Sequence, residues 1–116
     1  MQVILPWPLK ELSPNARLHW SKVAKAKKAY RKACWVMALQ AGVAGKFDKE
    51  QRLGVHMVFY PPDRRERDED NLVASMKSGL DGLADALGVN DRKFKPTQDI
   101  AEQIGGYVIV EIKPMQ

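Results

Sequence analysis

The chain has 116 residues, of which 45% are hydrophobic, and its 19 Lys and Arg against 14 Asp and Glu give a net charge of +5. The single cysteine excludes an internal disulfide and a multi-cysteine zinc site, and no apolar run approaches the ~20 residues that cross a bilayer. With no secretory leader pattern, we expect a cytoplasmic protein with one domain over residues 1–116.

Positive charge is concentrated in the first half of the sequence. Residues 1–52 carry eleven Lys and Arg but three Asp and Glu, whereas residues 53–116 carry eight and eleven. Seven basic residues and no acidic one lie between Arg17 and Lys32. This asymmetry suggests a polyanionic partner, although a lysine-rich face can also serve solubility alone.

The first half predicts a strand, a loop and a long helix. Residues 3–5 form a strand that prolines end, and residues 7–20 form a loop. Ser21 is the expected N-cap of a helix over residues 22–41, which Gly42 closes. Seven residues form its apolar stripe: Val23, Ala26, Tyr30, Ala33, Cys34, Met37 and Ala41.

The second half of this helix is also apolar on the face opposite its apolar stripe. Trp35, Val36 and Leu39 project from the face that carries lysines in the first half. A helix that is apolar all round is usually buried all round, so this part either enters a deeper core or meets another subunit.

The second half of the chain predicts a strand over 53–60, a charged segment over 63–70 and a helix over 71–87 that Gly88 closes. A weak strand over 97–103 and a strong one over 107–112 form a hairpin around Gly105 and Gly106. The expected fold is α/β (α+β), a small mixed sheet of about four strands with two main helices.

The acidic segment carries the most specific chemical signal. Asp68 and Asp70 point to the same side of an extended segment, where two carboxylates repel unless a cation lies between them. Mg²⁺ suits such a pair because it prefers oxygen ligands. Lys77 and Asp81 form an i,i+4 pair on the next helix, and Asp91 reaches this region only if the chain returns to it.

The same residues also fit a purely structural interpretation. A charged run between a strand and a helix is usually a solvated loop, Asp70 or Asn71 can cap the helix, and a surface Lys77–Asp81 pair contributes roughly 0.3–0.5 kcal/mol.

The chain resembles the RusA family of Holliday junction resolvases, found in bacteria and their phages. The resemblance rests on the run from Pro61 to Leu72, on Lys77, on residues 81–83 and on residues 90–91, with a softer match over residues 5–8 and 13–17. It implies a RusA-like fold and a homodimeric endonuclease that uses Mg²⁺, or Mn²⁺, to cut four-way DNA junctions symmetrically in recombination and repair. It also implies that Asp68, Asp70 and Asp91 gather as catalytic metal ligands, with Lys77 as the essential lysine.

Two positions depart from the family pattern. Ala74 stands where better-known members have the lysine, and Lys77 lies about one helical turn later. Asn90 replaces a common aspartate, and its carbonyl oxygen remains a possible ligand for a metal or a water.

Basic residues outside this acidic cluster are candidates for DNA contacts. Arginines beside the acids bind phosphate bidentately, and lysines along a helix follow a phosphate backbone. The candidate DNA-binding residues are Asn15, Arg17, Lys22, Lys25, Lys28, Lys32, Arg64, Arg65 and Arg67. The alternatives are a DNA-binding protein without catalysis, a nuclease for flaps or forks, and a structural partner protein.

Overall fold

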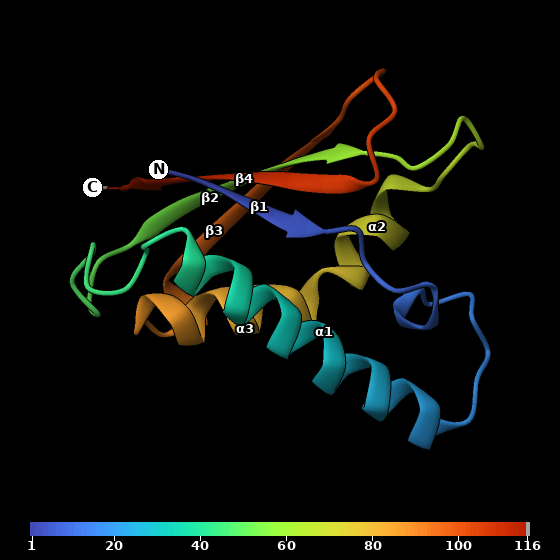
Figure 1. Ribbon diagram of the computed structural model, residues 1–116, viewed down its shortest axis with the longest axis horizontal. Helices are drawn as coiled ribbons and strands as arrows, with labels where there is room; N and C mark the ends of the chain where they lie inside the picture. The colour runs from blue at the N-terminus through green and yellow to red at the C-terminus, as the bar shows by residue number, and fades with distance from the viewer. Residues whose placement is uncertain (116) are drawn as a thin grey trace.

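The computed structural model describes residues 1–115. It places two long helices on one face of a four-stranded sheet and leaves the other face without a helix (Figure 1). The elements are β1 (Gln2–Pro6), η1 (Lys10–Leu12), α1 (Trp20–Gln40), β2 (Leu53–Tyr60), α2 (Glu69–Ser75), α3 (Lys77–Leu87), η2 (Asp91–Lys93), β3 (Phe94–Ile100) and β4 (Tyr107–Pro114). The expected α+β fold with a mixed sheet is confirmed. None of the helices within residues 1–115 has the length and apolar character needed to span a membrane.

The order of the strands across the sheet is β1-β4-β2-β3. β4 pairs antiparallel with both β1 and β2, and β3 pairs parallel with β2. The predicted hairpin of residues 97–103 and 107–112 is therefore wrong. Apolar β4, with Val108, Val110 and Ile112 buried, takes a central position. Polar β3 lies at an edge of the sheet. It contains Pro96, which has no backbone N–H to donate, and an edge strand tolerates the missing hydrogen bond because one side of the strand is unpaired.

Each central strand buries one face only. Side chains alternate between buried and half-buried along the whole of β2, as a sheet covered on one side requires. The helices supply the other half of the core, and Tyr30 of α1 is its largest fully buried side chain.

α1 begins two residues before the predicted start. The N-cap is His19 rather than Ser21, and its Nδ1 accepts a hydrogen bond from the Ser21 amide at 3.2 Å. Ala38 is buried near the C-terminal end in place of Met37 and Ala41.

The apolar second half of α1 does not enter a deeper core. Trp35 is 39% exposed and Leu39 is 38% exposed, so these side chains face solvent in the single chain. Of the two alternatives, the buried one is wrong.

The helix predicted over 71–87 is two helices that meet at Met76. Ser75 Oγ donates to the Asn71 carbonyl at 2.8 Å, a bond that competes with the backbone and bends helices. Met76 is fully buried, and its amide bonds to the Val73 carbonyl, three residues back, which tightens the last turn of α2. Burial of Met76 thus fixes the break, and Gly88 ends α3 at φ 74° as predicted.

Glycines allow α3 to approach α1 closely. A Cβ on Gly82 would overlap the Arg31 carbonyl oxygen, and one on Gly79 would lie 2.5 Å from Tyr30 Cε2. The backbones therefore meet where any larger residue would separate them.

We predict that Gly82→Ala destabilises the protein by about 1–3 kcal/mol, because the added methyl group must push α1 and α3 apart. Urea unfolding at equilibrium measures this change. Gly54→Ala is the matched control, since its Cβ would meet its nearest neighbours at ordinary distances of 3.6–3.7 Å. Equal stability of the two variants would contradict the close packing.

Candidate functional site

The charged segment before α2 folds around Asp63. The Asp63 carboxylate accepts from the Arg65 amide at 3.0 Å and pairs with the Arg67 guanidinium at 2.9 Å. The hydrogen bond from the Arg65 amide, followed by that from Arg67, lowers the pKa of Asp63. Arg67 also lies over the Trp7 ring, 5.4 Å from its centroid. These contacts commit Arg67 to holding the loop. Arg65 also pairs with Asp63, through Nε at 3.3 Å, but its side chain is far more exposed, so Arg64 and Arg65 are the better candidates for phosphate.

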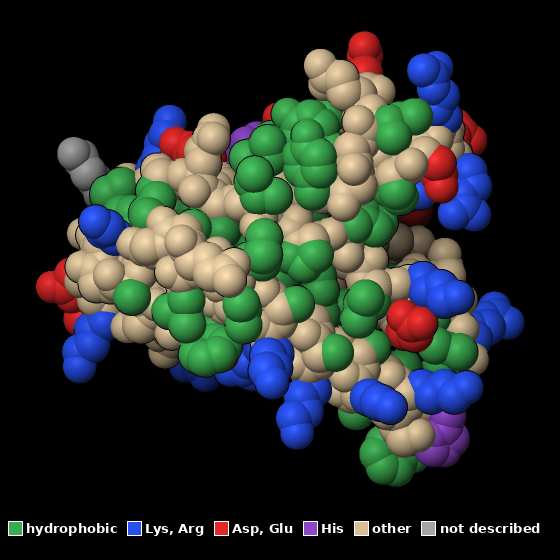
Figure 2. Space-filling model, in the orientation of Figure 1, with side chains coloured by type: hydrophobic (Ala, Val, Ile, Leu, Met, Phe, Trp, Pro, Cys, Tyr) green, Lys and Arg blue, Asp and Glu red, His purple; other side chains and the backbone are tan. Residues whose placement is uncertain are grey.

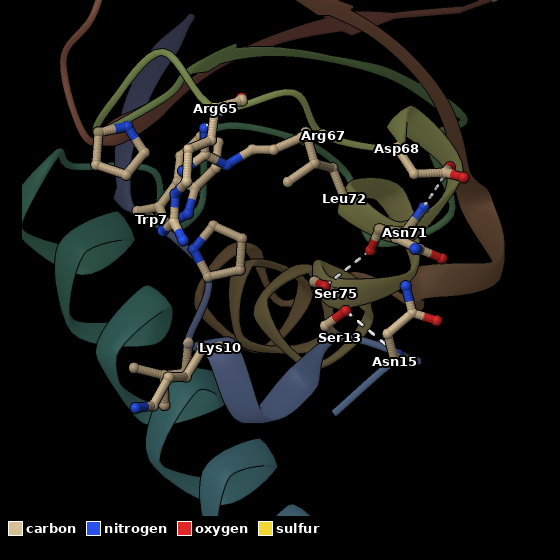
Figure 3. A pocket seen from close by; sticks show the side chains of 13 residues that line it. Trp7, Lys10, Ser13, Asn15, Arg65, Arg67, Asp68, Asn71, Leu72 and Ser75 are labelled. Atoms are coloured by element: carbon tan, nitrogen blue, oxygen red, sulfur yellow. Dashed lines mark hydrogen bonds between the residues drawn. The ribbon is translucent and has the colours of Figure 1, made fainter. Parts of the chain in front are cut away.

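A cavity of about 410 Å³, the arginine cavity, opens between this segment and the N-terminal loop (Figure 3). Four predicted site residues line it, namely Asn15, Arg65, Arg67 and Asp68. The polar residues that sequence reasoning did not assign to it are Lys10, Ser13, Asn71 and Ser75. Ser13 and Asn15 come from the loop after η1, and Asn71 and Ser75 come from α2, so the cavity joins segments far apart in the sequence.

Asp68 and Asp70 occupy the N-terminal end of α2, so the predicted extended segment that placed both carboxylates on one side is wrong. Asp68 is the N-cap, and its Oδ1 accepts from the amides of Asp70 at 2.9 Å and Asn71 at 3.3 Å. An acidic residue of this segment therefore caps the helix, as the structural interpretation predicted, but the cap is Asp68 rather than Asp70 or Asn71. Asp70 lies in the first turn with its carboxylate exposed, where the helix dipole favours negative charge.

A second cavity of about 400 Å³, the lysine cavity, lies along α3 and η2. Lys77 Nζ donates to Asp91 Oδ2 at 2.9 Å and to Asp81 Oδ1 at 3.2 Å. The chain therefore returns to Lys77 after α3, and the predicted Lys77–Asp81 pair is confirmed. Asp85 also lines this cavity, where Arg31 binds it through two nitrogen atoms at 2.7 and 3.0 Å.

The three expected metal ligands do not share a pocket. Asp68 lines the arginine cavity, Asp91 lines the lysine cavity, and Asp70 lines neither. Within the part of the chain that the structure describes, no group of three or more His, Cys, Asp or Glu side chains is arranged to hold a metal. Asp91 therefore shares no cavity with Asp68 or Asp70 in this structure, and the joint role of the three acids as metal ligands stays a prediction.

The charges in the lysine cavity stabilise each other. Hydrogen bonds to Asp91 and then to Asp81 raise the pKa of Lys77, and Lys77 in turn lowers the pKa of Asp91. Lys77 is therefore an ammonium ion at neutral pH. It can neutralise an anion, but it cannot act as a general base.

Asn90 has a structural role at the edge of the same cavity. Its side-chain oxygen accepts from the Arg92 amide at 2.9 Å and so caps η2. The carbonyl oxygen that the sequence offered as a ligand for a metal or a water is engaged by this backbone contact.

The predicted lysines of α1 lie on its solvent face. Lys22, Lys25, Lys28 and Lys32 are all exposed, and Arg17 is exposed in the preceding loop. Figure 2 shows basic side chains along the lower edge of the molecule, where α1 runs in Figure 1. Arg31, on the same helix, is paired with Asp85 instead.

Sequence reasoning missed a polar cluster on the bare face of the sheet. His56 contacts Thr97 Oγ1 through Nδ1 at 2.7 Å and Asp99 Oδ2 through Nε2 at 3.1 Å. The parallel register places His56 beside Thr97. The cluster depends on the pairing of β2 with β3. The predicted hairpin paired β3 with β4 instead, so nothing in the sequence placed His56 beside Thr97 and Asp99.

We predict that Lys77→Met raises the pKa of Asp91 toward the ordinary aspartate value of about 3.9, because the nearest cation is lost. Carboxyl carbon NMR during a pH titration measures the shift, and Lys95→Met, on exposed β3, is the control. Since the folded pKa of Asp91 is lowered, its contribution to stability is present above about pH 3.9 and is lost as the pH falls through the folded pKa. An unchanged Asp91 titration in Lys77→Met would contradict the pairing.

Comparison with known proteins identifies a bacterial relative of this chain. The chain is 45% identical over 111 residues to an uncharacterized protein of Xylella fastidiosa (strain Temecula1 / ATCC 700964), a match that covers 93% of this chain and 72% of that protein. No family model matches the chain. At this level of identity and coverage, the chain belongs to the same family as the uncharacterized Xylella protein.

Proposed function

We propose that the protein is a Mg²⁺-dependent endonuclease that resolves four-way DNA junctions, as its resemblance to the RusA family implies. The observation that carries the proposal is the arginine cavity, where Asp68 lies beside Arg65 and Asn15 and next to exposed Asp70. A carboxylate next to arginines and amides is suited to a phosphodiester whose charge is shared between protein cations and a metal ion.

Asp68 and Asp70 would hold a Mg²⁺ ion in this proposal without the help of Asp91. Mg²⁺ is commonly bound by one or two carboxylates, with water and substrate phosphate completing its six ligands. Asp68 uses Oδ1 alone for capping, and among residues 1–115 neither its Oδ2 nor the Asp70 carboxylate has a hydrogen-bond partner. When bound there, the ion would polarise the phosphate and lower the pKa of an attacking water.

The chain's own residues would position the strand. Arg65, whose side chain is 81% exposed, and Lys10 are available to hold phosphate oxygens at the mouth of the arginine cavity. Lys77 would neutralise charge on a phosphate one step along the strand, and Asp81 and Asp91 would keep it protonated and oriented. Asp91 thereby acts as the partner of the lysine rather than as a metal ligand.

Symmetric cutting requires two copies of this site. A four-way junction has near two-fold symmetry, and a C2 dimer supplies paired sites most simply. The exposed Trp35 and Leu39 on α1 support such a dimer, because they give the single chain an apolar surface to cover.

A second candidate is a branched-DNA-binding protein without catalysis. The separation of Asp91 from Asp68 and Asp70 favours it, because no set of three carboxylates is assembled among the described residues. Strand cutting with Mg²⁺ against EDTA distinguishes the two candidates.

We predict that Asp70→Asn abolishes junction cutting in Mg²⁺ and leaves junction binding unchanged or tighter, because an anion is removed from the DNA surface. Cleavage of a labelled four-way junction and a gel-shift titration measure the two effects. Glu102→Gln, which removes an exposed acid beyond β3, is the control and should cut normally. Normal cutting by Asp70→Asn would rule out the proposed role of Asp70.

We predict that replacing both Lys25 and Lys28 with Gln makes the slope of log K for DNA binding against log salt concentration shallower by roughly two. Each phosphate contact contributes about 0.9 to this slope. Affinity measured over a series of salt concentrations gives the slope. Lys46→Gln with Lys49→Gln, two exposed lysines beyond α1, is the control pair. An equal loss of slope in both double variants would show that α1 is not the DNA-binding face.

A further inference from the structure

An apolar groove of about 780 Å³ lies between the N-terminal loop, the start of α1 and the α2–α3 break. Its wall is mostly aliphatic and includes Leu18, Val73 and Leu80. Leu18 is 38% exposed, which places an apolar side chain in water on an otherwise strongly basic part of the chain. None of these residues belongs to the arginine or lysine cavity.

Cations surround this apolar wall. Arg17, Lys27 and Lys77 line the groove against one acid, Glu11, so its rim carries a net positive charge. Arg17 has φ 47°, a left-handed conformation that costs a non-glycine residue free energy and concentrates at functional sites. Residues 16–18 all line the groove, so this strained turn forms part of its wall.

Lys77 connects the groove to the proposed reaction site. Its side chain, which is 71% exposed, lines both the groove and the lysine cavity. A strand with a phosphate at Lys77 would therefore have a neighbouring nucleoside directly at the apolar wall.

We propose that the groove receives an unstacked nucleotide of the bound DNA, with its base against Leu18 and Val73 and its phosphates at Arg17 and Lys77. The occupant follows from the chemistry of the groove, because a nucleotide combines a flat, poorly hydrated base with an anionic backbone. A neutral apolar peptide would offer no anion to Arg17 and Lys27. The inference rests on the proposed binding of branched DNA and adds that the protein opens the branch point.

The test uses a four-way junction that carries 2-aminopurine at a branch-point base, with EDTA present so that no strand is cut. This base analogue fluoresces more strongly when it leaves the stack and lies against aliphatic rather than aromatic groups. We expect a several-fold rise in fluorescence on binding, and no rise for an unbranched duplex with the same base at its centre.

Leu18→Gln should remove most of the fluorescence rise and weaken junction binding roughly fivefold, with duplex affinity unchanged. Ile104→Gln is the matched control, since Ile104 is also exposed, at 48%, but lies in the loop between β3 and β4. Thermal unfolding of both variants checks that each is folded, and Val73→Gln provides a second variant at the same wall.

Several outcomes would overturn the proposal. A fall in fluorescence would mean that the base stacks on an aromatic side chain. A rise in the Leu18→Gln and Val73→Gln variants equal to that of the unmodified protein would show that the groove does not hold the base. A change from dimer to monomer in light scattering of Leu18→Gln would show that the groove is a subunit contact. Junction binding without a rise would overturn this inference alone. A rise without cutting in Mg²⁺ would support it and overturn the proposed nuclease, and no DNA binding would overturn both.

Discussion

The hydroxyl of Tyr30 connects the parts of the chain on which both cavities depend. It donates to the Pro6 carbonyl at 2.7 Å and contacts Met76 Sδ at 3.2 Å, so α1, the end of β1 and the α2–α3 break meet at one buried group. Burial raises the pKa of Tyr30, so the hydroxyl keeps its proton and remains a donor. Its position fixes where the N-terminal loop leaves the sheet and where α2 ends.

From this point the polar chemistry divides between two helices. The N-terminal end of α2 presents the Asp68 carboxylate and Asn71 to the arginine cavity, whereas α3 presents Lys77 and Asp81 to the lysine cavity. A continuous helix would have continued the face of Asp70 and Ala74 through Lys77. The helix is interrupted at Met76, and beyond that break Asp91 returns to Lys77 rather than to the cavity that Asp68 lines.

Local patterns predicted much of the fold. Alternation placed β2 at residues 53–60, and the Gly88 end of α3 followed from the helical stripe. The hairpin failed because Gly105 and Gly106 are a local turn signal, whereas the burial of apolar β4 between β1 and β2 is a long-range effect. In the site, the spacing of Lys77 and Asp81 sufficed to pair them, but the position of Asp91 depends on tertiary packing that spacing does not encode.

Because an ammonium group tethered to the chain separates Asp81 from Asp91, these two acids carry their own counterion. A tethered counterion does not diffuse away on dilution, and a chelator cannot extract it. Neutralisation of Asp81 and Asp91 in the folded chain consequently requires no divalent ion from the surroundings.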